Sequence, residues 1–285
     1  MKRILFIAAA LLLLASCAPK PQKVFARFVP ERADDFAWEN DYVAYRAYGE
    51  ALETLNPGGM ISPGFDVWVK NTTDLVVDQR YYDDLNNGIS YHIDHGQGKD
   101  CYKVGVTLGG GASSPLIDGK LCFPATNFRS NEVLECSPEK VVFVLHYPEW
   151  EAEGWKIALD KKITVTAGTH FCLAEDTYTF EGPADSLLIA AGIVRHDVQC
   201  ESELEDGFAI WEKASDTGAE PEDSCLGLAI KLPGATFVGQ TEDGVHSICA
   251  KAVKSGETFA YYFGSCWSKA DINSPEAWFD LLAEL

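Results

Sequence analysis

The stretch Lys156–Phe180, KIALDKKITVTAGTHFCLAEDTYTF, decides the fold class of this chain. It holds two candidate strands, Lys156–Thr166 and Phe171–Phe180, which are rich in β-branched and aromatic residues. The residues between them include Gly168, which favours a turn. The stretch therefore predicts two neighbouring antiparallel strands.

The same pattern continues through the rest of the chain. Asp118-Gly119 is a hairpin signal between the candidate strands Pro115–Ile117 and Lys120–Phe123. The further candidate strands are Glu132–Cys136, Val141–Tyr147, Ser186–Val194, Gly207–Glu212, Gly227–Leu232, His246–Val253 and Thr258–Phe263. Many strands and few helices predict an all-β chain that folds as a large antiparallel β-sandwich with a few short helices.

The remaining elements are fewer. Trp38–Tyr48 alternates as one strand, with Tyr45 on one side and Arg46 on the other. Thr73–Tyr82 is predicted to be a helix capped by Thr73, and Ser274-Pro275 is predicted to begin a closing helix. The acidic stretches Cys200–Gly207 and Ser215–Ser224 are predicted to be exposed loops. Because no low-complexity linker divides the chain, residues 24–285 are predicted to form one domain.

The N-terminus has the features of an export signal. Basic residues at Met1–Arg3 precede an apolar run, Ile4–Leu14, which is too short to cross a bilayer as a permanent helix. The run ends in Leu14-Ala15-Ser16-Cys17, which resembles a bacterial lipobox. We expect residues 1–16 to be a signal peptide, Cys17 to be lipidated and residues 17–23 to be a tether. A plain secretory signal is the alternative. The tether lacks an acidic run, which favours the periplasmic face of the outer membrane.

Charge and cysteine content limit the partners. A net charge of −20 argues against nucleic acid and against anionic membrane surfaces, so membrane contact is expected only through the lipid. An acidic substrate would need a local cluster of cations. The eight cysteines after Cys17 show no metal-binding spacing, and their pairing is left open. We predict neither a metal nor a cofactor.

One polar segment, Asn86–Lys103 (NNGISYHIDHGQGKDCYK), concentrates titratable side chains. Its glycines interrupt regular structure, and a long polar loop of this kind often has a function. We interpret it as one wall of a sugar-binding, catalytic cleft that contains His92 and His95. The alternatives are a solvated loop and a metal site formed by His92, Asp94 and His95.

Four motifs resemble one known family. They are FARFVPERADDFAWENDYVAYRAYG (Phe25–Gly49), SYHIDHGQGKDCYKVG (Ser90–Gly105), LHYPEW (Leu145–Trp150) and FGSCWSKADI (Phe263–Ile272). Together they resemble the domain-of-unknown-function family 4861, and Cys101 is a departure from its pattern. Members are mostly secreted or lipid-anchored proteins of polysaccharide-degrading Gram-negative bacteria. The resemblance implies a galactose-mutarotase-like supersandwich and an activity similar to that of an oligosaccharide dehydratase acting on uronate ends.

Such an elimination needs three kinds of group. A base removes the proton beside the carboxylate, an acid protonates the leaving oxygen, and a cation stabilises the carboxylate. The candidate catalytic residues are His92, His95, Tyr91 and Tyr102. The candidate substrate-binding residues are Arg46, Asn40, Lys103, His146, Tyr147, Trp150, Trp267 and Lys269. Arg46 has a competing role as an ion-pair partner of Glu39 or Asp41, and both tryptophans have competing roles in the core.

The sequence therefore predicts a lipoprotein lyase or dehydratase that acts on uronate-containing oligosaccharides. The alternatives are a non-catalytic glycan-binding or assembly lipoprotein and, more weakly, a sugar epimerase or mutarotase. The catalytic hypothesis requires Arg46, His92, His95 and His146 to meet in one pocket open to solvent.

Overall fold

The computed structural model describes residues 20–214 and 224–285. One sheet contains five antiparallel strands in sequence order: β1 (Val24–Val29), β2 (Asp35–Asn40), β3 (Ala44–Ala47), β4 (Asp66–Lys70) and β5 (Gly98–Asp100). A second sheet contains eight strands in the order β13 (Val198–Leu204), β14 (Gly207–Lys213), β15 (Cys225–Lys231), β18 (Thr258–Trp267), β11 (Phe171–Glu181), β10 (Trp155–Thr166), β9 (Lys140–Ala152) and β8 (Ser130–Cys136). A third has the order β16 (Phe237–Gln240), β17 (His246–Lys254), β12 (Ser186–Val194), β6 (Gly110–Ile117) and β7 (Lys120–Leu121).

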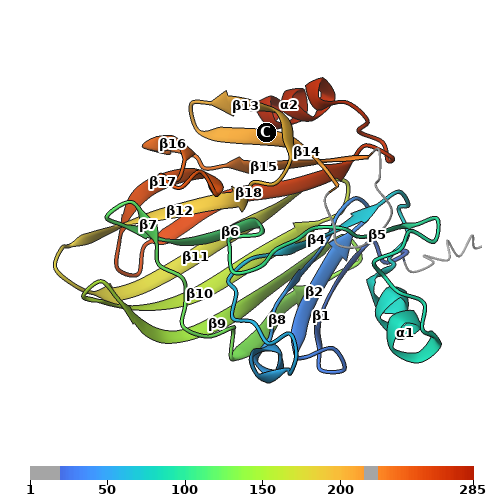
Figure 1. Cartoon of the computed structure of the whole chain (residues 1–285), viewed down its shortest axis with the longest axis horizontal. Coiled ribbons are helices and arrows are strands. Elements are labelled where there is room, and N and C mark those ends of the chain that lie inside the picture. The colour runs from blue at the N-terminus through green and yellow to red at the C-terminus, as the bar shows by residue number, and fades with distance from the viewer. Residues whose placement is uncertain (1–19, 215–223) are drawn as a thin grey trace, which may run out of the picture.

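These sheets form a sandwich, which confirms the predicted fold class (Figure 1). The eight-stranded sheet is one layer, and the ring of Phe263 on β18 packs against Trp38, Tyr45 and Phe65 of the first five-stranded sheet. An isolated bridge between Phe65 and Gly109 links the two five-stranded sheets, which together form the other layer. The core between the layers is continuous from Val24 to Trp267.

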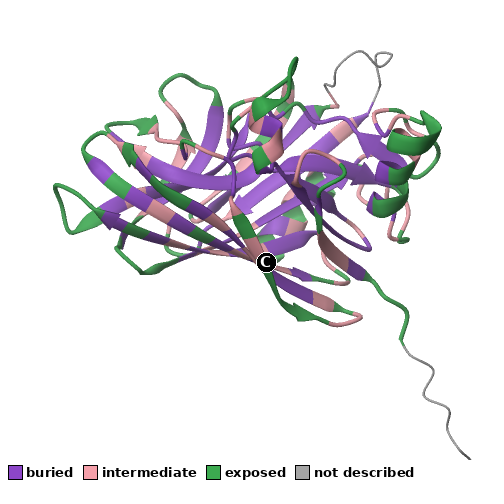
Figure 2. Ribbon diagram, turned by 90° about the horizontal axis from the view of Figure 1, so that it is seen from below, coloured by how far each residue is buried: buried purple, intermediate pink, exposed green. Residues whose placement is uncertain are grey.

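Strands β10 and β11 are neighbours in the eight-stranded sheet, as the stretch Lys156–Phe180 predicts. The pair is antiparallel, with Ile163 opposite Ala174. Along β10, buried residues alternate with more exposed ones, and Figure 2 shows this banding on the long strands. At the β6–β7 hairpin, Asp118 and Gly119 have φ values of 48° and 77°, which match the favoured two-residue turn.

The first helix differs from its prediction. Helix α1 spans Val77–Asn87, so it begins later than Thr73, extends into the polar segment and ends at Gly88 in a left-handed conformation. Thr73 does not cap it. Instead, the carboxylate of Glu39 on β2 accepts hydrogen bonds from the backbone N–H groups of Val76 and Val77. A side chain from a distant strand therefore sets the start of this helix.

The closing helix confirms its prediction. Helix α2 spans Pro275–Glu284, and the Ser274 hydroxyl accepts a hydrogen bond from the backbone N–H of Ala277. Its residues Trp278 and Leu282 pack against Phe171, Ala209, Trp211, Ala229 and Cys266 on the outer face of the eight-stranded sheet. A short 3-10 helix spans Glu50–Thr54.

Two other predictions need correction. Trp38–Tyr48 is not one strand, because a turn separates β2 from β3, and the Asn40 side-chain oxygen accepts hydrogen bonds from Tyr42 and Val43 in that turn. The acidic stretch Cys200–Gly207 is not a loop. Most of it belongs to β13, an edge strand whose charged side chains face solvent.

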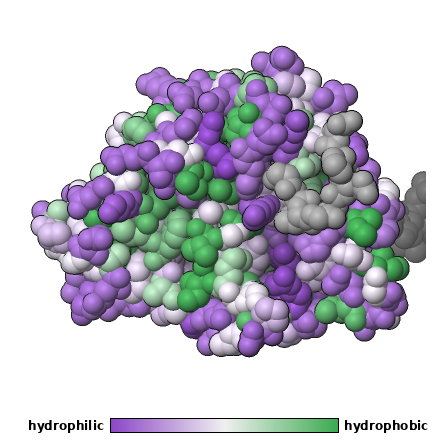
Figure 3. Space-filling view, viewed as in Figure 1, coloured by the Kyte–Doolittle hydropathy of each residue, from purple (hydrophilic) through white to green (hydrophobic). Residues whose placement is uncertain are grey.

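Several predictions fall outside the described residues. They concern the signal peptide, lipidated Cys17 with its membrane location, and most of the loop Ser215–Ser224. Within residues 20–214 and 224–285, neither helix is long and apolar enough to cross a membrane. None of the eight cysteines in these ranges forms a disulfide bond. On the face in Figure 3, hydrophilic residues surround a central group of apolar ones.

Candidate functional site

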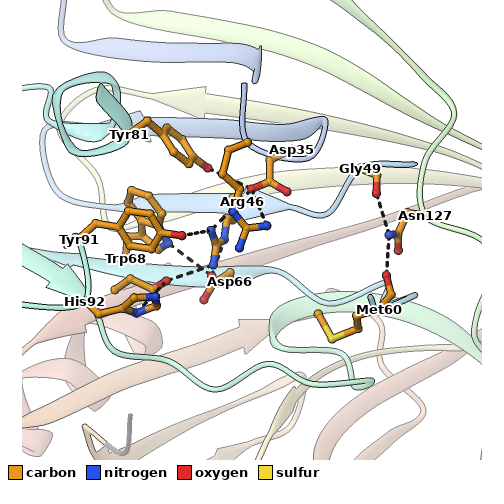
Figure 4. Close-up of polar contacts among 12 residues, drawn as sticks. Asp35, Arg46, Gly49, Met60, Asp66, Trp68, Tyr81, Tyr91, His92 and Asn127 are labelled. Carbon is orange, nitrogen blue, oxygen red and sulfur yellow. Dashed lines mark hydrogen bonds and ion pairs between the residues drawn. The ribbon is translucent and has the colours of Figure 1, made fainter. Parts of the chain in front are cut away.

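Arg46 lies at the centre of a buried ionic cluster on the outer face of the first five-stranded sheet (Figure 4). Only 4% of Arg46 is exposed. Its Nε donates to Asp66 Oδ2 at 2.6 Å and its Nη2 donates to Asp100 Oδ2 at 3.1 Å, while Nη1 lies 3.6 Å from Asp35 Oδ2. The strand register explains part of this arrangement, because Arg46 is directly opposite Asp66.

Aromatic rings enclose the guanidinium of Arg46. Its central carbon lies 5.4 Å from the ring centroid of Tyr48, 5.3 Å from that of Trp68 and 5.5 Å from that of Tyr91. The Tyr91 hydroxyl accepts a hydrogen bond from Arg46 Nη1 at 3.3 Å. From helix α1, the Tyr81 hydroxyl donates to Asp35 Oδ2. The helix and the polar loop therefore cover the cluster.

His92 connects the cluster to solvent. Its side chain is 44% exposed, and its Nδ1 lies 3.6 Å from Asp100 Oδ2. The ring of His92 packs on that of Tyr91, with 4.6 Å between centroids. A partly exposed imidazole backed by a buried carboxylate is suited to proton transfer.

Asp35 is the most perturbed carboxyl group of the cluster. Burial raises its pKa to about 6, although Arg46 and Arg32 act in the opposite direction. Its ordinary pKa is 3.8, so the folded state binds this proton more tightly than the unfolded state does. The resulting stabilisation is present below pH 3.8 and is lost as the pH rises through about 6.

We therefore expect Asp35→Asn to change how stability depends on pH. Between pH 4 and pH 7, the unfolding free energy of the wild type should fall by about 2 kcal/mol relative to that of the variant. Urea unfolding at a series of pH values measures this difference, and Asp118→Asn in the exposed hairpin turn is the control for the charge change. A constant difference between wild type and Asp35→Asn would contradict the assignment.

A pocket of about 200 Å³, which we call the loop pocket, lies between helix α1 and the polar loop. Arg80, Tyr91 and His95 are among its lining residues. Arg80 Nη2 donates to the backbone carbonyls of Val69 and Gln97, which fixes the guanidinium at the pocket wall.

The loop around the pocket is held by its own hydrogen bonds. Asp94 Oδ1 accepts hydrogen bonds from the backbone N–H groups of Gly96 and Gly98, and both glycines have positive φ. His95 Nε2 lies 3.2 Å from the Ser90 carbonyl oxygen. Because a carbonyl only accepts, Nε2 carries the proton, and Nδ1 is the basic nitrogen of the neutral ring.

The structure brings some predicted site residues together and separates others. Arg46, Tyr91, His92 and His95 lie in or beside the polar loop. His146 does not join them. On β9, Phe143 and Leu145 point into the core, so His146 points out from the eight-stranded sheet, where its Nδ1 lies 2.7 Å from Asp160. The prediction that His146 shares one pocket with Arg46, His92 and His95 is therefore wrong.

Five further candidates are buried and do not line the loop pocket. Trp150, Trp267 and Tyr147 belong to the core, so neither tryptophan offers a face to a sugar. The Tyr102 hydroxyl is enclosed by the carbonyls of Gly109 and Val194. Asn40 is fully buried, and its amide donates to the carbonyls of Thr166 and Thr169. Their side chains are structural, which corrects the roles expected for them.

The two lysines among the candidates are exposed. Lys103 contributes its backbone carbonyl to His196 Nε2. Lys269 places its ammonium 5.4 Å from the ring centroid of Trp267, so it covers the buried indole. Neither lysine lines the loop pocket.

The possible metal site is not formed. His92, His95 and Asp94 have separate contacts, with Asp100, the Ser90 carbonyl and two backbone N–H groups respectively. Across the described part of the chain, no three His, Cys, Asp or Glu side chains are arranged to hold a metal ion.

Sequence reasoning missed the role of Arg80 and of the aspartates around Arg46. Arg80 was visible only as part of a helical pattern. Asp35, Asp66 and Asp100 are spread over three strands, and nothing in their local sequence shows that they converge. A signal was available for Arg46 alone, because strand alternation placed it opposite the core-facing Tyr45.

Among solved structures, two are distantly similar to this chain. A putative kojibiose phosphorylase from human microbiome has a TM-score of 0.43 and 9% identity, covering 94% of this chain and 36% of its own. The GH36 alpha-galactosidase AgaB from Geobacillus stearothermophilus has a TM-score of 0.37 and 8% identity, covering 86% of this chain and 41% of its own.

Sequence comparison gives a clearer result. The chain is 30% identical over 259 residues to the "Uncharacterized protein P7" of Formosa agariphila, an alignment that covers 86% of this chain and 62% of the relative. The chain thus spans less than two thirds of the length of that relative. The family model described as "Domain of unknown function (DUF4861)" matches residues 15–285, and the chain belongs to this family.

Proposed function

We propose that this protein is a carbohydrate-active enzyme that eliminates water from, or cleaves at, uronate residues of oligosaccharides. The observation that carries the proposal is that Arg80, His95 and Tyr91, which carry a guanidinium, an imidazole and a phenol, all line the loop pocket. These are the three kinds of group that such an elimination needs.

Arg80 is the cation of the site. Guanidinium groups bind planar carboxylates well, and a carboxylate placed against Arg80 would delocalise the charge that develops when the adjacent proton leaves. Two backbone carbonyls hold Arg80 in place, so little of its freedom is left to lose on binding. If the Arg80 side chain is shortened, these two carbonyl groups lose their hydrogen-bond donor.

His95 is the base and Tyr91 is the acid. His95 Nδ1 takes the proton from the carbon beside the carboxylate, and that electron pair forms the new double bond. The bond from the neighbouring carbon to its oxygen breaks, and the Tyr91 hydroxyl protonates the leaving oxygen. In its hydrogen bond with Arg46 the phenol oxygen is the acceptor, so Arg46 does not engage the hydroxyl proton of Tyr91.

His92 has a supporting role. It lies against Tyr91 and beside Asp100, so it can return a proton to the phenol through solvent after each turnover. The ionic cluster behind it fixes Tyr91, because Arg46 donates to the hydroxyl and Trp68 stacks on the ring at 4.7 Å.

The test is turnover of a panel of oligosaccharides with uronate ends, followed by the ultraviolet absorbance of the unsaturated product and by the mass loss of one water. We expect His95→Gln and Tyr91→Phe to lower the rate by about 10²–10⁴-fold. His146→Gln, the same change on the opposite face, should leave the rate unchanged. The proposed enzymatic activity would be refuted if no acidic oligosaccharide gave product. It would also be refuted if His95→Gln and His146→Gln had equal rates.

A non-catalytic glycan-binding protein is the second candidate. Its support is the hydrogen bond of His95 Nε2, which is with a backbone carbonyl and not with a carboxylate that would activate the ring as a base. Calorimetric binding of the same oligosaccharides without any chemical change would favour it over the enzyme.

A further inference from the structure

A second pocket lies at one end of the first five-stranded sheet, and we call it the strand-end pocket. Its volume is about 230 Å³. Three separate segments form it: the β2–β3 turn with Asp41 and Tyr42, the end of β4 from Lys70 to Thr73, and the residues after β18 with Lys269 and Asp271. The first and last segments belong to motifs that carry the family resemblance, yet the proposed reaction does not use them.

Donors and acceptors are both present in this pocket. Asp41 and Asp271 provide carboxylate oxygens, while Lys269 and the Asn71 amide provide N–H donors. Lys70 is buried, and its ammonium donates to Glu39 Oε2 at 2.9 Å and to the Asn40 carbonyl at 2.5 Å. An ammonium has three donors, so Lys70 has one more N–H beyond these two bonds.

The aromatic side of the pocket is fixed in position. The half-buried ring of Tyr42 lies 4.6 Å from the His170 ring, and His170 Nε2 lies 3.0 Å from Asp271 Oδ2. His170 Nδ1 is 3.1 Å from the Ser265 carbonyl oxygen. Tyr42 and Asp271 are therefore positioned by one histidine, which is a site prepared before any ligand arrives.

These observations exclude several ligand classes. An anion would meet two carboxylates, and the charge of Lys70 is already balanced by Glu39. A metal ion would meet two lysines, and no three-ligand set exists in the described residues. An apolar ligand would leave the lining donors and acceptors without partners.

We propose that the strand-end pocket binds one neutral monosaccharide residue. Each sugar hydroxyl both donates and accepts, so it can pair with carboxylates and ammonium groups in the same pocket, and the ring face can pack on Tyr42. The volume of about 230 Å³ is small, which suits one sugar ring rather than a chain. The proposal does not rest on the proposed reaction, because it concerns binding alone.

The test is calorimetric and saturation-transfer NMR titration of the full mature protein with methyl glycosides of neutral hexoses, and with methyl glucuronide as the charged comparison. We expect binding of at least one neutral glycoside in the millimolar range. Tyr42→Ala and Asp271→Asn should each weaken it about tenfold. Thermal unfolding checks that both variants are folded.

One control variant and one further pocket variant complete the test. Tyr82→Ala removes an exposed tyrosine of helix α1 outside this pocket and should leave the affinity unchanged. Asn71→Ala changes an exposed lining residue and should weaken binding without affecting folding. The proposal is overturned if no neutral glycoside binds, if only methyl glucuronide binds, or if Tyr42→Ala and Asn71→Ala bind as the wild type does. Turnover at the loop pocket is measured separately, so either proposal can fail alone.

Discussion

Arg46→Met should lower the free energy of unfolding by about 3–5 kcal/mol, because it leaves the carboxylates of Asp35, Asp66 and Asp100 buried without their shared cation. Breaking a buried ion pair from one side costs far more than the pair itself contributes. A domain has only about 5–15 kcal/mol of stability in total, so this variant should unfold at much lower urea concentration.

Arg27→Met is the matched control for this result. Arg27 also contacts two carboxylates, with its Nε 2.6 Å from Asp78 and its Nη2 2.5 Å from Glu31, but these contacts are exposed. Exposed ion pairs contribute about 0–1 kcal/mol, so the control should unfold near the wild-type concentration. If Arg46→Met were no less stable than Arg27→Met, the buried cluster would not be ionic in the folded protein.

Lys161→Met should also destabilise the protein by about 3–5 kcal/mol. Lys161 is fully buried between the two layers, and its ammonium lies 2.6 Å from Asp176 Oδ2 and 3.2 Å from the Ser113 hydroxyl. Burial lowers the pKa of Lys161 and raises that of Asp176, and the attraction between the two groups opposes both shifts. Loss of the ammonium leaves Asp176 charged or forces it to take up a proton, and both outcomes cost stability.

The adjacent strand positions supply the control. Lys162 Nζ lies 2.7 Å from Glu175 Oε2 on the same two strands, but on the outer face, where both side chains are partly exposed. Lys162→Met should cost less than about 1 kcal/mol. The double variant Lys161→Met/Asp176→Leu should recover most of the loss, because apolar residues replace the whole pair. Equal midpoints in urea for the two single lysine variants would contradict the expected burial effect.

The buried pair also shows what sequence pattern can and cannot reveal. Lys161 occupies a core position of β10, between the buried residues Leu159 and Ile163, so strand alternation alone would predict an apolar residue there. Its partner Asp176 is on the neighbouring strand β11 and also faces the core. The two residues are direct cross-strand partners, so their contact depends on the register of the β10–β11 pair, which strand alternation alone does not specify.

Local patterns determined the elements whose causes are local. Alternation in Lys156–Phe180, the Asp118-Gly119 turn and the Ser274 cap each act within a few residues, and the structure has all three where the sequence places them. The long series of candidate strands with few helices predicted the antiparallel sandwich. The sequence also showed that His92 and His95 share one polar loop with Tyr91, since these residues are neighbours in the chain.

Only the tertiary structure decided the relations between distant residues. Glu39 fixes the start of helix α1 from 38 residues away, against the local signal of Thr73. His146 and His92 lie on opposite outer faces of the sandwich, although the sequence alone allowed both to line one pocket. Alternation states which residues share a side of a strand, but the layer packed against that strand determines which side becomes core and which becomes surface.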